Sequence, residues 1–209
     1  MPPIELRPLS RADFPSLRQW LNEPHVREWW RGPILGPAEV EREYGPSVDG
    51  AEPTRCRVIL TDGEPVGLIQ GYRHADHPEW DQAVGIPRAA GLDYLIGRPD
   101  RRGQGIAPAA IRAFADELLA LHPDTALVVS VPQKANRASC RALEKAGFTF
   151  SHDADLDTDD PSDSDTSAIY TYARPAGTGE PHVCHPDAHP DSHPDSHPDS
   201  HSEEEPARD

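Results

Sequence analysis

Hydrophobic positions along the chain follow two different periods, and the two kinds of segment alternate. Short, nearly continuous apolar runs such as Ala126–Val131 predict strands, and this run suits a strand that is buried on both faces. The stretch Gly105–Leu121 instead carries an apolar residue at every fourth position, from Ile106 to Leu118, which predicts a helix with one buried face. Strands that alternate with helices indicate an α/β domain with a mixed sheet.

Turn and capping residues suggest where these elements begin and end. Ser10-Arg-Ala-Asp13 resembles a capping box and opens a helix that runs through Leu21. Asp62-Gly63 between two strand-like runs is a strong hairpin signal. The other predicted helices are His25–Trp30, Ala38–Tyr44, Gly105–Leu121 and Asn136–Ala146, and the predicted strands are Ile4–Leu9, Arg57–Thr61, Pro65–Tyr72, Gly91–Gly97, Ala126–Val131, Phe148–Phe150 and Ala168–Ala173.

Charge is concentrated in two acidic segments. Of the formal net charge of −16, residues 1–150 contribute −2, residues 151–174 contribute −6 and residues 175–209 contribute −8. Nucleic acid is therefore not an expected partner, because phosphates require a basic surface. A membrane span needs about 18 uninterrupted apolar residues, and neither such a run nor a secretory signal is visible. We expect a cytoplasmic protein, present as a monomer or homodimer.

The last 35 residues differ in composition from the rest, which predicts a folded domain over residues 1–174 and a disordered tail over residues 175–209. The tail holds seven prolines and no aromatic residue, and its His-Pro-Asp-Ser repeats place five histidines four residues apart. It is either a loose chelator for zinc, nickel or copper, or a solubilising segment that binds metal incidentally. We expect no metal to be required.

A glycine-rich segment, Arg102-Gly-Gln-Gly105-Ile-Ala107, joins a predicted strand to a predicted helix. Without Cβ atoms the backbone can turn tightly, so that its N–H groups converge on an anion. The start of the helix adds unpaired N–H donors and the positive end of the helix dipole. Arg98 and Arg101 supply further positive charge. The loop therefore suits a pyrophosphate, although an ordinary glycine-rich turn would look the same.

A second segment, Asn136-Arg-Ala-Ser-Cys-Arg-Ala-Leu-Glu-Lys-Ala-Gly-Phe148, follows the loop. Together the two segments resemble the GNAT N-acetyltransferase superfamily, over roughly residues 4–173. The resemblance implies a mixed, mostly antiparallel central sheet flanked by helices, with acetyl-CoA as cosubstrate. It also implies that acetyl-CoA is held by Asn136 and by the backbone of Leu95, Ile96, Arg102, Gly103, Gln104, Gly105, Ile106 and Ala107.

Within the superfamily, four stretches resemble aminoglycoside 6′-N-acetyltransferases: Trp20–Trp30, Tyr44–Val48, Gly63–Tyr72 and Gly91–Asp93. The resemblance implies an acceptor site lined by Trp30, Tyr44, Gln70, Tyr72, Trp80 and Asp93. The same group includes acyltransferases of siderophore lysine or hydroxylysine, which typically carry histidine where this chain has Asp93. The aspartate therefore favours a polycationic amine.

The residue types agree with a cationic acceptor. Aromatic faces stack on sugar rings and attract ammonium groups, and carboxylates bind ammonium groups by charge-assisted hydrogen bonds. Residues 76–81, interpreted as a loop, supply both types. The acidic run Asp153–Asp165 either attracts a polycation before it docks or is a solvated flexible loop.

Asp93 is the predicted catalytic residue, which accepts the amine proton and orients the ammonium group. A backbone N–H near Leu95 is predicted to meet the developing oxyanion. The chain departs from the family pattern at two positions. Leu143 stands where a tyrosine usually protonates the leaving thiolate, and Val131 stands where an acidic acceptor-binding residue is usual.

Three functions are therefore open. The first is an acetyl-CoA-dependent N-acetyltransferase for an aminoglycoside or similar amine, by direct attack in a ternary complex. The second is a siderophore-precursor acyltransferase. The third, from another class, is a coenzyme A-binding protein whose histidine-rich tail handles metal.

Overall fold

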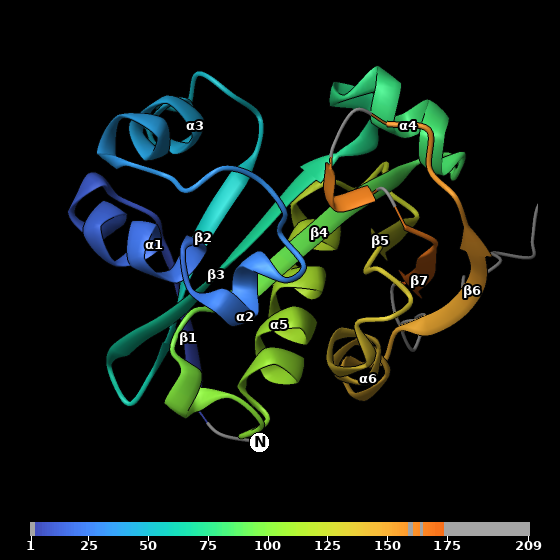
Figure 1. Cartoon of the computed structure of the whole chain (residues 1–209). Helices are drawn as coiled ribbons and strands as arrows, with labels where there is room; N and C mark the ends of the chain where they lie inside the picture. The colour runs from blue at the N-terminus through green and yellow to red at the C-terminus, as the bar shows by residue number, and fades with distance from the viewer. Residues whose placement is uncertain (1–2, 159–160, 164, 174–209) are drawn as a thin grey trace, which may run out of the picture. The chain divides into compact units, whose positions relative to one another are not determined.

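The computed structural model describes residues 3–158, 161–163 and 165–173, which include a seven-stranded mixed sheet in the order β1-β2-β3-β4-β5-β7-β6 (Figure 1). The strands are β1 (Ile4–Pro8), β2 (Arg55–Thr61), β3 (Glu64–Arg73), β4 (Ala89–Ile96), β5 (Leu127–Ser130), β6 (Thr149–Ala154) and β7 (Ser167–Ala173). The helices are α1 (Phe14–Leu21), α2 (Pro24–Arg27), α3 (Pro37–Asp49), α4 (Pro78–Val84), α5 (Ile106–Leu121) and α6 (Arg137–Ala146).

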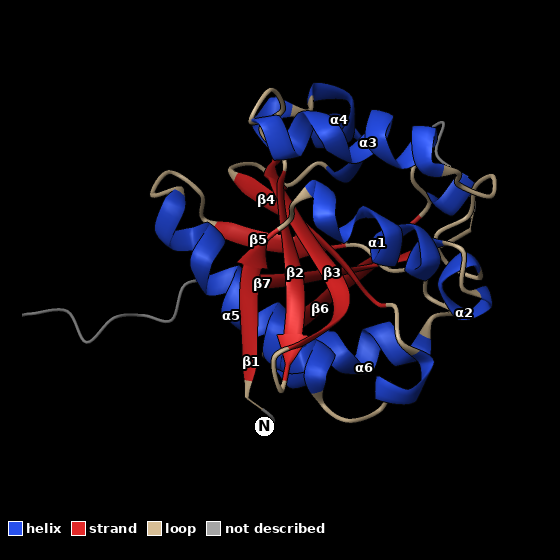
Figure 2. Ribbon diagram, turned by 90° about the vertical axis from the view of Figure 1, so that its left-hand side faces the viewer, coloured by secondary structure: helices blue, strands red, loops and turns tan. Residues whose placement is uncertain are grey.

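Helices cover both faces of the sheet, with α5 on one face and α1 and α3 on the other (Figure 2). The α5 face holds a core centred on Phe114, which is fully buried. A Cβ atom on Gly71 of β3 would lie 2.7 Å from Leu118 and 2.9 Å from Phe114. The glycine therefore lets α5 pack directly against the β3 backbone. The opposite face holds a second core, to which Trp20 and Leu17 of α1 contribute.

The pairing of β4 changes along its length. On one side β4 is antiparallel to β3 from Ala90 to Ile96. On the other side it is parallel to β5, but the pairing covers only Ala89–Gly91 with Leu127–Val129. The half of β4 from Leu92 onward, which contains the predicted site residues Asp93, Leu95 and Ile96, therefore continues beyond the pairing with β5.

Most of the predicted elements are confirmed, with bounds that shift by a few residues. Asp62 and Gly63 both have positive φ, 54° and 74°, as the predicted two-residue hairpin turn requires. The Asn136 side chain accepts a hydrogen bond from the Ser139 N–H, and Gly147 ends α6 with a φ of 95°. The mixed, mostly antiparallel sheet is also as expected.

The prediction of a loop over residues 76–81 is wrong, because α4 occupies Pro78–Val84. Pro78 lies at the start of this helix and Gly85 ends it in the left-handed conformation, with a φ of 67°. Seven residues are too few to show a helical period of apolar positions. The predicted helix over residues 25–30 is shorter than expected and ends at Arg27.

The boundary at residue 174 and the histidine-rich tail lie outside the described residues. Within the part of the chain that the structure describes, the helices are all too short or too polar to cross a membrane.

Replacing the central residue of the α5 core tests this packing. We expect Phe114→Ala to lower the free energy of unfolding by about 3–5 kcal/mol, because it leaves a cavity where the side chain is fully buried. Phe150→Ala is the matched control, since Phe150 is 48% exposed, and should cost far less. Urea unfolding of both variants measures the difference, and equal losses would contradict the core assignment.

Candidate active site

A cavity of about 900 Å³ lies beside the half of β4 that extends beyond its pairing with β5, and we call it the β4 cavity. Fourteen of the sequence-predicted site residues line it: Trp30, Tyr44, Gln70, Tyr72, Trp80, Asp93, Leu95, Ile96, Arg102, Gly103, Gly105, Ile106, Ala107 and Asn136. Gln104 is the exception and does not line the cavity; its side-chain amide donates to the Asp100 carbonyl at 2.7 Å. One cavity thus combines the predicted cofactor loop and the predicted acceptor residues.

The glycine loop forms one end of this cavity. Gly103 and Gly105 both have positive φ, 73° and 79°, and a Cβ atom on Gly103 would meet nothing within 4 Å. Gly105 caps the N-terminus of α5, whose first N–H groups have no partner within the helix. The loop therefore presents backbone donors next to open space, as a diphosphate group requires.

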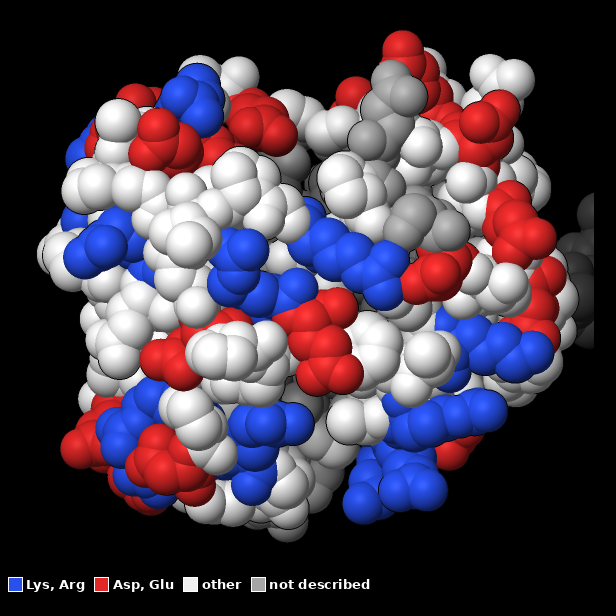
Figure 3. All heavy atoms as spheres, in the orientation of Figure 1, with Lys and Arg blue, Asp and Glu red and all other residues white. Residues whose placement is uncertain are grey.

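Basic side chains surround the same end, although they are not equivalent. Arg98 and Arg101 form ion pairs with acidic neighbours, both of them with Glu64. Three others that line the cavity form no ion pair with a described residue: Arg102, Arg141 and Lys145. Figure 3 shows basic side chains gathered over α6 and around the loop that leads into α5. The unpaired cations are the ones left for an anionic ligand.

Cys56, Gln70 and Asp93 lie next to one another across β2, β3 and β4, because the strand register makes them partners. The Cys56 thiol is 3.9 Å from Gln70 Oε1. Tyr44 of α3 packs in the core on this face of the sheet. Burial raises the pKa of Tyr44 well above its usual range, and the negative charges of Glu43 and Asp93 add to the shift. Tyr44 therefore remains a neutral hydroxyl beside the carboxylates.

Aromatic side chains form the wall between β3 and α4. A Cβ atom on Gly91 would lie 2.5 Å from the Tyr72 ring, so only glycine leaves room for this tyrosine. The Tyr72 ring makes an edge contact with His77, with 4.9 Å between ring centroids. Behind them His74 makes an edge contact with Trp80, at 6.5 Å. The wall is therefore built from one continuous stretch of the chain, residues 72–80, and Gly91 of the neighbouring strand leaves room for it.

His74 is buried without a hydrogen-bond partner. Its side chain is 1% exposed, and neither ring nitrogen has a hydrogen-bond partner among the described residues. Burial lowers the pKa of His74 from 6.5 to about 4, although Asp81, 3.8 Å away, acts in the opposite direction. The imidazole is therefore neutral near pH 7 and packs between the rings of Tyr72 and Trp80.

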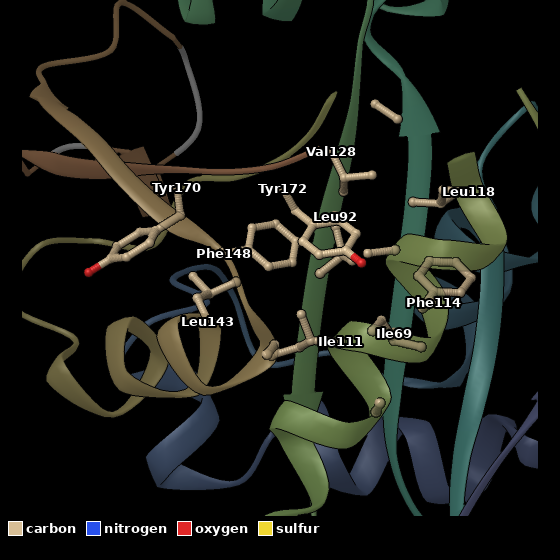
Figure 4. Close-up of a cluster of buried hydrophobic side chains, with 14 of the residues drawn as sticks. Ile69, Leu92, Ile111, Phe114, Leu118, Val128, Leu143, Phe148, Tyr170 and Tyr172 are labelled. Atoms are coloured by element: carbon tan, nitrogen blue, oxygen red, sulfur yellow. The ribbon is translucent and has the colours of Figure 1, made fainter. Parts of the chain in front are cut away.

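Helix α6 forms the opposite wall. Asn136 caps this helix, and Ser139 in its first turn lines the cavity. Leu143, one turn later, is fully buried and packs with Phe148 and Tyr170 in the core that Figure 4 shows. The position at which relatives are expected to carry a tyrosine therefore contributes no side chain to the cavity.

A set of hydrogen bonds connects the segment after α2 to the β6–β7 connection. The Arg31 guanidinium bonds Asp165 at 2.6 Å and Gln133 Oε1 at 3.0 Å, while the Arg31 N–H bonds Ser162 at 3.1 Å. In the acidic run, Asp165 thus pairs with Arg31, and Asp153 pairs with Lys134. These two carboxylates are engaged within the domain.

Some residues that line the β4 cavity were not among the sequence-predicted site residues. They include Trp29, Glu43, Glu52, His77, Tyr94 and Ser139. Trp29 and Trp30 are adjacent, and both are half-buried and line the cavity. The remaining residues of this set could be assigned to the cavity only from the strand register and from the packing of α3 and α6. The described residues contain no group of three or more potential metal ligands.

The open edge of β4, the glycine loop and the order of the elements define an acetyltransferase of the GNAT class. The chain belongs to the acetyltransferase (GNAT) domain family, whose model matches residues 10–156. This confirms the family expected from the two sequence motifs.

Individual relatives agree with this assignment. Aminoglycoside N(6′)-acetyltransferase type 1 of Klebsiella pneumoniae is 32% identical over 148 residues, which cover 69% of this chain and 73% of that protein. Lysine N-acyltransferase MbtK of Mycobacterium sp. strain MCS is 26% identical over 155 residues, 74% of this chain and 63% of that protein. The crystal structure of aminoglycoside acetyltransferase AAC(6′)-Ib with coenzyme A superposes with a TM-score of 0.70, at 28% identity over 82% of this chain and 95% of that one.

The burial of His74 predicts a pH dependence of stability. The folded state disfavours the protonated ring, so stability is complete above the ordinary pKa of 6.5 and falls as the pH decreases toward 4. The full loss is about 3 kcal/mol. Urea unfolding at several pH values between about 4 and about 7 measures it. We expect His74→Phe to flatten this part of the profile, whereas the exposed control His152→Gln should not, and an unchanged slope in His74→Phe would contradict the assignment.

Proposed function

We propose that this chain transfers the acetyl group of acetyl-CoA to an amino group of an aminoglycoside or a similar polycationic amine, by direct attack in a ternary complex. The observation that carries the proposal is the β4 cavity itself. It joins an anion cradle at Gly103–Ile106 to a carboxylate, Asp93, that is surrounded by aromatic side chains. The residues involved all lie within residues 1–174, which we propose as the catalytic domain.

The cofactor end supports acetyl-CoA. The backbone N–H groups at the start of α5 and the cations Arg102, Arg141 and Lys145 match the charge of a nucleotide diphosphate. The open edge of β4 from Leu92 to Ile96 offers backbone groups to an extended pantetheine arm. His25 Nε2 donates to the Ile96 carbonyl at 2.9 Å, so the groups nearer Asp93 are the ones left for the cosubstrate. Related solved structures contain coenzyme A.

The acceptor end supports a cationic sugar. Trp30, Tyr72 and Trp80 present aromatic faces, and Asp93, Glu43 and Glu52 supply negative charge within the same cavity. Ammonium groups bind both kinds of side chain. Glu43 and Glu52 line the same cavity as Val131, so the cavity contains other carboxylates although this position lacks one. A related crystal structure, of AAC(6′)-Ib, contains coenzyme A and kanamycin.

In this proposal Asp93 binds the acceptor ammonium group and removes its proton, directly or through water, so that the neutral amine can attack. The β4 backbone near Leu95 donates to the carbonyl oxygen as it gains charge. Because the cavity holds both substrates beside one strand, much of the acceleration comes from their fixed proximity.

The alternative is acylation of a lysine-type amine. The 26% identity to a lysine N-acyltransferase supports it. Asp93 argues against it, because acyltransferases of siderophore lysine or hydroxylysine are expected to carry histidine at that position. The two functions differ in how many positive charges the acceptor carries.

An acetyl-CoA consumption assay across aminoglycosides, polyamines, lysine derivatives and peptides tests the function. We expect turnover with aminoglycosides or polyamines and much weaker turnover with lysine derivatives, because several carboxylates and aromatic rings line the site. A chain that ends at residue 174 is the control, and it should give the same kinetics. Preference for a singly charged lysine-type acceptor would favour the alternative instead, and loss of activity on truncation would place an essential role in the tail.

Asp93→Asn tests the catalytic assignment. We expect kcat to fall about 100-fold or more, because the amide cannot accept the amine proton, while acetyl-CoA binding measured by calorimetry stays unchanged. Asp124→Asn, at an exposed residue outside the cavity, is the matched control and should retain full activity. Full activity of Asp93→Asn would remove Asp93 from catalysis.

A further inference from the structure

We propose that Tyr94 is the proton donor to the sulfur that leaves when the acetyl group is transferred. The inference rests on the proposed acetyl-CoA-dependent function and adds a residue to it. Tyr94 directly follows Asp93 on β4, and it takes over a role for which Leu143 is unsuited.

Adjacent residues of a strand point to opposite faces of the sheet. Asp93 shares its face with Leu95, which packs in the core beneath α1 and α3. Tyr94 shares its face with Leu92 and packs against the core beneath α5 and α6. Both nevertheless line the β4 cavity, because it extends around the strand where the pairing with β5 has ended. A thioester at this edge would have the carboxylate on one side and the phenol on the other.

The Tyr94 hydroxyl is held in a defined position. Its oxygen is 2.8 Å from Ser139 Oγ, and the Ser139 N–H is in turn fixed by the Asn136 cap at 3.1 Å. Ser139 also lines the cavity, so it lies where a proton could pass between the cavity and Tyr94. When Ser139 Oγ donates to the Tyr94 oxygen, the phenolic proton points to the Ser139 carbonyl, 3.4 Å away. For transfer to the leaving sulfur, the proton would rotate from this long contact toward the cavity.

Burial raises the pKa of Tyr94 well above its usual range, and the phenol is therefore protonated at neutral pH. A group that keeps its proton in the resting enzyme is a competent donor to a thiolate, whose ordinary pKa is near 8.5. A charge-assisted hydrogen bond from the phenol would also stabilise the thiolate as it forms.

Leu143 cannot perform this step. It is fully buried in the core and lies outside the cavity lining. Of the described tyrosines that line the cavity, Tyr44 and Tyr72 lie on or near the Asp93 side, whereas Tyr94 is fixed to α6. The hydroxyl that relatives are expected to supply from α6 is thus supplied here from β4, against the same helix.

In the proposed step, the amine nitrogen forms a bond to the acetyl carbon. The carbon–sulfur bond breaks, and its electron pair stays on the sulfur. Tyr94 gives its proton to that sulfur, which yields the coenzyme A thiol. Ser139 passes a proton from cavity water to the Tyr94 oxygen, and the proton lost by the amine leaves through Asp93 to water.

The first test uses coenzyme A alone and needs no acceptor. Ultraviolet difference titration of bound coenzyme A gives the pKa of its thiol. We expect this pKa to lie below the ordinary value near 8.5 in the wild type and to rise by about one unit in Tyr94→Phe, which loses the donor but keeps the ring. The matched control is Tyr170→Phe, because Tyr170 is also buried but donates to Glu144 outside the cavity, and it should leave the thiol pKa unchanged.

The second test measures turnover with the acceptor found in the assay above. We expect kcat of Tyr94→Phe to fall about 10- to 100-fold at an unchanged KM for acetyl-CoA, and Ser139→Ala to show a smaller loss. An unchanged thiol pKa in Tyr94→Phe overturns the proposal, and so does a fall in kcat accompanied only by weaker coenzyme A binding. Failure of the wild type to bind coenzyme A would overturn the proposed function itself. If no acceptor is acetylated, the thiol titration alone tests whether Tyr94 donates a proton to the sulfur.

Discussion

The site depends on the short pairing between two parallel strands. β4 and β5 pair over only three residues each, and the β4 cavity lies beside the part of β4 that continues past them. Backbone groups that a longer ladder would have occupied are therefore available to a ligand. The rest of the domain supports this arrangement, because β3 pairs with β4 along its length and α5 packs against both strands.

Charge is divided along the same cavity. Cations from the glycine loop and from α6 gather at one end, and carboxylates from α3 and β4 gather near the other. The division suits two substrates of opposite charge that must meet at one strand. Several loop arginines are already paired with acidic neighbours, so the positive potential there depends on a few unpaired residues.

The two faces of β4 present different chemical groups to the site. Asp93 shares its face with Leu95, on the side of the sheet that α1 and α3 cover, whereas Tyr94 contacts α6 through Ser139. A strand can place an acid and a base on adjacent residues because its side chains alternate, and both remain accessible only where a neighbouring strand is missing. Leu143 can then serve as a core residue without loss of a hydroxyl at the site.

The sequence by itself determined the features that depend on local chemistry. The Asp62-Gly63 turn, the Asn136 cap, Gly147 and the glycine loop were predictable because their backbone conformations are set by a few neighbouring residues. Of the fifteen site residues that the family resemblance implied, fourteen line the cavity. Only the tertiary structure decided that both Trp29 and Trp30 line the site and that Tyr94 contacts Ser139. These features depend on strand register and helix packing between segments distant in the chain, which no local pattern records.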